Sequence, residues 1–323
     1  MLGAVALLGL LAAGLAFGGF SSDDSDDTTD GPYPGDPVDP ETPTTPIGEI
    51  IYGTDGYDSL IGTDGDDEVY AYAESDIVET GGGDDLVEAG LGDDYVDGGD
   101  GNDTLNGQAG DDELLGGEGD DLIYGEGGND SVFGGPGADE LYGDWGDDYV
   151  VGGDGDDVVK GGAGDDAVDG GFGDDLVLGG LGMDTLLGGA GNDILDGLIT
   201  DTPMGNDIDQ ADTLFGAEGD DILVMGEGDE AVGGAGADVF IAGTWITSEV
   251  ATIGDYVAGE DQIVVNYDEL ASPTPVLTID EISDGTTDYA VLSLDGQPVA
   301  QVIIYAGMPV PEVSEIALVA AVW

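Results

Sequence analysis

Aspartates spaced nine residues apart are the groups of this chain with the clearest capacity for chemistry. From Asp58 to Asp193 every ninth residue is Asp, in sixteen consecutive units that begin at Gly53. A second carboxylate often stands directly before it, as in Asp156–Asp157. Paired carboxylates can act as the acid and base of a glycosidase or serve as oxygen ligands for a cation.

The composition excludes most other kinds of site. The 323 residues contain 74 acidic groups and one basic group, Lys160, for a formal net charge of −73. A single Lys cannot replace the counterions of a nucleic acid, and an anionic membrane surface would repel the chain. Because the sequence has no His and no Cys, it allows no Ser-His-Asp triad, no Cys nucleophile, no His-ligated zinc and no disulfide.

The carboxylates belong to a repeating unit, shown by GGAGDDAVD at residues 161–169. The eighth position is Val, Leu or Ile in all sixteen units, from Leu60 to Leu195. Since side chains alternate along a strand, the last three residues of a unit predict a short strand with only the eighth position, here Val168, pointing inward. This array resembles the glycine-rich GGxGxDxUx nonapeptide repeat of the RTX family over roughly residues 53–241.

The resemblance implies an all-β fold, a calcium-bound parallel β-roll in which two nonads form one coil and every second unit stacks directly on the last. Calcium would lie between stacked turns, shared by two sixth-position carboxylates and backbone carbonyls, about a dozen ions in all. The glycosidase interpretation is rejected, because every pair falls in the repeat register. The predicted calcium ligands are Asp58, Asp67, Asp85, Asp94, Asp103, Asp112, Asp121, Asp130, Asp139, Asp148, Asp157, Asp166, Asp175, Asp184, Asp193, Asp212, Asp221 and Asp238.

Some units depart from the pattern. In AYAESDIVE, residues 71–79, Glu74 replaces a turn glycine, so a poor calcium site is expected there. The looser units of residues 207–241 place Glu230 at a sixth position, and one of them is a residue short. Fifth-position carboxylates and Lys160 are expected to face solvent. Tyr124 and Tyr142 should stack, either as a packing ladder, which is favoured, or as a carbohydrate or partner platform.

Calcium is expected to supply much of the folding free energy. Each nonad buries about one aliphatic side chain, and that apolar burial is too small to offset the conformational entropy lost by nine ordered backbone residues. The roll is therefore predicted to be unfolded without calcium.

The predicted organisation has six segments. Residues 1–20 form an apolar targeting or anchor segment, and 21–48 a disordered linker rich in Asp, Ser, Thr and Pro. They are followed by the β-roll at 49–197, an insertion at 198–206, a second repeat block at 207–241 and a C-terminal β cap at 242–323. In the cap, the pattern around Asp255 and Asp261 resembles the end of serralysin-like RTX rolls, and a hairpin is predicted at Asp295–Gly296. The apolar C-terminus fits a type I secretion signal or a last strand.

The function predicted is that of a secreted or cell-surface calcium-binding RTX protein without catalytic activity, in a structural, adhesive or interaction role. Its expected partners are calcium ions and a surface or matrix polysaccharide or protein, with no nucleic acid and with membrane contact only through residues 1–20. The alternative is a secreted hydrolase or polysaccharide-modifying enzyme whose activity lies in the C-terminal region.

Overall fold

The structure is a computed structural model that describes residues 48–199, 208–267, 274–283, 287–304, 310–313 and 316–320. The predicted segments 1–20 and 21–48 lie outside these ranges, apart from Gly48. The described residues include no helix with the length and apolar character needed to cross a membrane.

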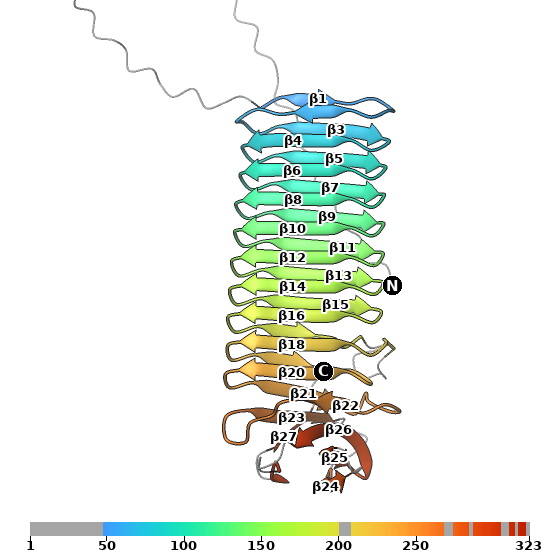
Figure 1. The fold of residues 1–323 in the computed structure, drawn as a ribbon, viewed down its shortest axis with the longest axis vertical. Helices are drawn as coiled ribbons and strands as arrows, with labels where there is room; N and C mark the ends of the chain where they lie inside the picture. Colours follow the sequence, from blue (N-terminus) through green and yellow to red (C-terminus); the bar gives the residue numbers. More distant parts are fainter. Residues whose placement is uncertain are drawn as a thin grey trace, which may run out of the picture. The chain divides into compact units, whose positions relative to one another are not determined.

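Two long sheets face each other, and consecutive strands from β1 to β23 alternate between them (Figure 1). In spatial order the 13-stranded sheet contains β1 (Ile50–Tyr52), β3 (Glu68–Ala73), β5 (Leu86–Leu91), β7 (Thr104–Ala109), β9 (Leu122–Gly127), β11 (Glu140–Trp145), β13 (Val158–Ala163), β15 (Leu176–Leu181), β17 (Ile194–Asp196), β19 (Ile222–Val224), β21 (Val239–Gly243), β23 (Gln262–Tyr267) and β27 (Ile316–Ala320). The 14-stranded sheet contains β2 (Ser59–Ile61), β4 (Ile77–Gly82), β6 (Tyr95–Asp100), β8 (Glu113–Glu118), β10 (Ser131–Pro136), β12 (Tyr149–Asp154), β14 (Ala167–Phe172), β16 (Thr185–Ala190), β18 (Thr213–Glu218), β20 (Glu230–Ala235), β22 (Ala251–Ile253), β26 (Gln297–Ile304), β25 (Asp288–Leu294) and β24 (Leu277–Ser283). The predicted parallel β-roll is confirmed.

The repeat sets the register between coils. Leu141 pairs with Ile123 on one side and Val159 on the other, so each coil consists of two nonads, as predicted. The insertion lengthens one coil, since Thr185 pairs with Thr213. The short unit makes a later coil a single residue shorter than two nonads, since Thr213 pairs with Glu230.

Most strands of the roll are six residues long, which corrects the prediction of three. β14 continues past Asp169 through the first three positions of the next unit, because Gly171 and Phe172 also pair with the coil before them. Its burial alternates, and Val168 and Gly170 both face inward. The core is therefore one column of eighth-position aliphatic side chains in each sheet, with small first-position residues beside them.

The strands beyond the repeats close the far end of the roll. β27 extends one sheet by pairing with β23, and β26 extends the other by pairing with β22. β24, β25 and β26 form an antiparallel meander, with the predicted hairpin turn at Asp295 (φ 52°) and Gly296 (φ 80°) confirmed. Ile253 and Ile263 are fully buried beneath this cap. The likeness of the cap to that of serralysins stays a prediction.

Replacing one core leucine should destabilise the calcium-loaded roll. Leu141→Ala removes a fully buried side chain and should lower the free energy of unfolding by about 2–5 kcal/mol, because it leaves a cavity in the core. Leu91→Ala is the matched control, since Leu91 is 59% exposed. Denaturant midpoints measured in saturating calcium should separate the two variants, and equal midpoints would contradict the proposed core.

Candidate calcium sites

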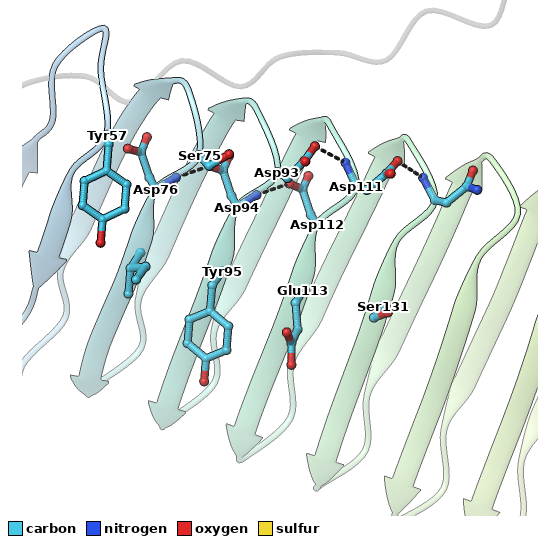
Figure 2. A pocket seen from close by; sticks show the side chains of 12 residues that line it. Tyr57, Ser75, Asp76, Asp93, Asp94, Tyr95, Asp111, Asp112, Glu113 and Ser131 are labelled. Atoms are coloured by element: carbon cyan, nitrogen blue, oxygen red, sulfur yellow. Dashed lines mark hydrogen bonds between the residues drawn. The ribbon is translucent and has the colours of Figure 1, made fainter.

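The sixth-position aspartates line up along the two edges of the roll, where the chain passes between sheets. The backbone N–H of each one donates to Oδ1 of the Asp one coil later. Asp76 donates in this way to Asp94, and Asp94 to Asp112, each at 2.7 Å (Figure 2). Each carboxylate is thus held in the gap between its own turn and the turn before it.

For most of them the other oxygen has no hydrogen-bond partner among the residues that the structure describes. Sixth-position aspartates from Asp67 to Asp238 are at most 3% exposed, so water does not solvate them freely. The Oδ2 atoms buried without a hydrogen bond belong to Asp76, Asp85, Asp94, Asp103, Asp112, Asp121, Asp130, Asp139, Asp148, Asp157, Asp166, Asp175, Asp184, Asp193, Asp212 and Asp221. An unpaired buried carboxylate oxygen is strongly unfavourable, so each needs a cation or a proton.

Glycines create the hollow that these oxygens face. A Cβ atom at Gly170 would lie 2.5 Å from Oδ2 of Asp175 and 2.7 Å from the carbonyl oxygen of Gly188, one coil away. No side chain fits there, and the neighbouring donors are a carboxylate and a backbone carbonyl. That donor set is the one that Ca²⁺ prefers, and these residues would hold the ion.

The turn backbone also depends on glycine. Gly162 has φ 127° and Gly164 has φ 149°, values that residues with a Cβ rarely adopt. In the unit predicted to be weak, Tyr72 (φ 86°) and Glu74 (φ 66°) occupy the same left-handed conformations. Asp76 of that unit nevertheless lies in the row with a buried Oδ2, although the prediction left it out.

A second row of side chains runs along the outside of the same turns. Oδ1 of fifth-position Asp93 accepts the N–H of Asp111 at 3.1 Å, and Oδ1 of Asp111 accepts that of Asn129 at 2.9 Å. This outer row reaches toward the following coil, whereas the buried row reaches toward the preceding one. The fifth positions are exposed, as predicted, so solvent reaches their remaining oxygen.

The first two turns differ from the rest. Oδ2 of Asp58 accepts the backbone N–H of Thr54 at 2.6 Å and its hydroxyl at 2.9 Å. Thr63 donates in the same way to Asp67. Here threonine takes the second position of the unit, and its groups occupy the carboxylate oxygen that elsewhere has no partner.

The eighteen predicted ligands all lie in the two buried rows, which also include residues outside that set. In the short unit, Asp229 rather than Glu230 takes the sixth-position place: its Oδ1 accepts the N–H of Asp212 at 2.9 Å, and Glu230 is exposed. Counting back from the inward-facing Ala231 would have found Asp229. In the cap, Asp261 accepts the N–H of Asp238 at 3.1 Å and continues the other row.

Burial controls the protonation of the metal-free rows. Desolvation raises the pKa of Asp112, Asp121 and Asp166 to about 7. The backbone N–H that each carboxylate accepts lowers its pKa and so cancels part of this rise. Carboxylates one coil away raise these pKa values further. At neutral pH the calcium-free roll therefore carries buried negative charge that opposes its own folding.

Without calcium, acid should favour the roll. A carboxylate whose pKa is raised on folding opposes folding fully above its folded value, here about 6–7, and the opposition fades as pH falls toward its unfolded value near 3.8. In chelator, far-UV circular dichroism should therefore show more β-structure at about pH 5 than at about pH 8. Light scattering would check for aggregation, and a signal that does not change with pH would contradict this account.

Sixth and fifth positions should differ in calcium binding. Asp157→Asn removes the charge of a buried carboxylate at two junctions, so about two ions per chain should be lost or weakened. Asp156→Asn makes the same chemical change at the exposed adjacent residue, whose Oδ1 bonds only a backbone N–H at 3.0 Å. Calorimetric calcium titration should show normal stoichiometry for Asp156→Asn. Identical losses in both variants would contradict the assignment.

Comparisons with known proteins agree with the repeat. A family model described as the RTX calcium-binding nonapeptide repeat (4 copies) matches residues 47–78, 70–105, 106–141, 142–177, 178–199 and 209–229. No curated protein matches the chain.

Two solved structures are similar in part. The AlgE6R3 subunit from the Azotobacter vinelandii mannuronan C5-epimerase shares 24% identity with a TM-score of 0.25, over 46% of this chain and 80% of its own. The extracellular lipase LipA from Serratia marcescens shares 14% identity with a TM-score of 0.21, over 54% of this chain and 40% of its own. The matched repeats cover more than half of the sequence, and the chain belongs to the RTX calcium-binding nonapeptide-repeat family.

Proposed function

We propose that this chain is an exported protein whose roll folds on binding calcium and then acts, without catalysis, as a structural or interaction element. The observation that carries the proposal is the pair of rows of buried Oδ2 atoms without hydrogen-bond partners. A fold with such rows is unfavourable until cations occupy them, so metal binding becomes folding free energy. The ligands proposed are the sixth-position aspartates, together with Asp229, whose Oδ2 also accepts the N–H of Gly226 at 2.6 Å.

Export follows from the calcium concentration that such sites need. Extracellular calcium modules typically bind at about 10⁻⁴–10⁻³ M, well above the level inside a cell. A roll of that affinity would remain unfolded inside the cell and fold outside it. The apolar segment 1–20 and the linker 21–48 are proposed to be the targeting segment and spacer.

Exposed apolar side chains support an interaction role. Trp145, Phe172 and Leu91 are third-position residues, 74%, 66% and 59% exposed at the ends of strands. Trp and Phe are enriched in protein–protein interfaces relative to the rest of the protein surface. The proposed partner is a surface or matrix polysaccharide or protein.

The tyrosine pair supports internal packing rather than a platform. Tyr124 and Tyr142 stack with centroids 4.8 Å apart and planes at 15°, so each ring covers a face of the other. The Lys160 ammonium lies 4.3 Å from the centroid of Tyr142 and 3.7 Å from the carboxylate of Glu140. Lys160 is therefore part of this cluster, which corrects the expectation of a simply solvated side chain.

Catalysis in the C-terminal region is the weaker candidate. The two carboxylates of the cap motif accept hydrogen bonds from backbone N–H groups. Asp255 accepts the N–H groups of Gly233 and Gly234, both at 2.9 Å, and Asp261 accepts those of Asp238 and Val257. These contacts favour a capping role.

Calcium titration of the full chain tests the proposal. Far-UV circular dichroism should change cooperatively from coil to β-structure as calcium is added to chelated protein, and magnesium should not substitute, because it prefers fewer ligands at shorter distances. A protein that is fully structured in chelator at neutral pH and insensitive to calcium would overturn the proposal.

A further inference from the structure

One junction of the roll differs from all regular ones in its acidic groups. It lies where the insertion lengthens the coil, between the turn ending at Asp184 and the turn ending at Asp212. Asp209, which belongs to neither predicted row, brings a third carboxylate there. One oxygen each from Asp184, Asp209 and Asp212 lies within 4.8 Å of the others.

The third carboxylate enters by replacing a backbone contact. At the preceding coil on this edge, the N–H of Gly164 donates to the carbonyl oxygen of third-position Leu181 at 2.8 Å. One coil on, the N–H of Gly182 donates instead to Oδ1 of third-position Asp209 at 2.7 Å. A side chain with a full negative charge thus stands where other turns present a carbonyl dipole.

Buried oxygens without a hydrogen-bond partner point to a ligand at this position. Asp184 and Asp212 are each 2% exposed, and the Oδ2 atom of each is buried without a hydrogen-bond partner. The outer row also ends here, since Met183 (53% exposed) takes the place that Asp165 holds one coil earlier. Asp209 is therefore an additional inward carboxylate and does not continue the outer row.

We infer that Asp184, Asp209 and Asp212 form a three-carboxylate calcium site that binds more tightly than the two-carboxylate junctions and holds the two repeat blocks together across the insertion. This inference rests on the proposed calcium binding of the repeats. The affinity of oxygen-ligand sites rises with the number of charged ligands and with their rigidity. Two backbone N–H groups orient Asp209, because its Oδ1 accepts that of Gly182 and also that of Gln210 at 2.8 Å.

The test compares two variants of the full chain that each lose one carboxylate on the same edge. Asp209→Asn removes the third ligand, and Asp165→Asn removes an exposed outer carboxylate whose Oδ1 accepts the N–H of Met183 at 3.0 Å. Calcium-loaded proteins are titrated with a competing chelator, and retained calcium is measured per chain. In Asp209→Asn the tightest site should weaken by about tenfold or more, whereas Asp165→Asn should retain it.

The outcomes separate this inference from the proposed function. If the wild-type chain binds no calcium, the proposed function fails. If the wild type binds calcium but the tightest site is unchanged in Asp209→Asn, only the three-carboxylate site is overturned. Circular dichroism in saturating calcium checks folding. If Asp209→Asn does not fold, Asp209→Glu, which keeps the charge, decides: a tight site retained there supports the inference, and its loss overturns it.

Discussion

Buried carboxylate oxygens without protein partners are the constraint on which the rest of this structure depends. In most turns one oxygen accepts a backbone N–H from the preceding coil, and the other, which has no hydrogen-bond partner, faces a hollow that is usually lined by glycine and a carbonyl. The absence of a Cβ at the first position keeps that hollow open, and glycines at the second and fourth positions allow the backbone to surround it. The turn glycines and the acidic sixth position thus follow from a single local requirement.

Much of this could be predicted from the periodicity, because one unit dictates the geometry of all. The invariant eighth position predicted which aliphatic side chains are buried, and the resemblance to the RTX repeat predicted that each coil is two units long. Strand length was wrong for a physical reason: glycine has low strand propensity alone, but in a stack each glycine pairs with an equivalent glycine one coil away, as Gly153 does with Gly171. The neighbouring coil supplies what local propensity does not.

The misplaced residues lie where the period changes. Glu230 was taken for the sixth position because counting ran forward across a missing turn residue, whereas the structure keeps the inward side chain in register and shortens the turn. Asp209 had no pattern to mark it, since its role depends on an insertion of irregular length. Lys160 was expected in solvent, although it follows Tyr142 by eighteen residues and the two-nonad coil therefore places it beside that tyrosine on the adjacent strand.

The stacking of coils also has a mechanical consequence. Each coil adds about 4.8 Å to the stack, the spacing of paired strands, whereas its two nonads would span about 60 Å when extended. A coil that opens under tension therefore releases more than tenfold its folded length. If the chain were held by one end and pulled by the other, calcium would determine the force at which the coils open and this extra length is released. The roll would then behave as a tether whose length depends on its ionic surroundings.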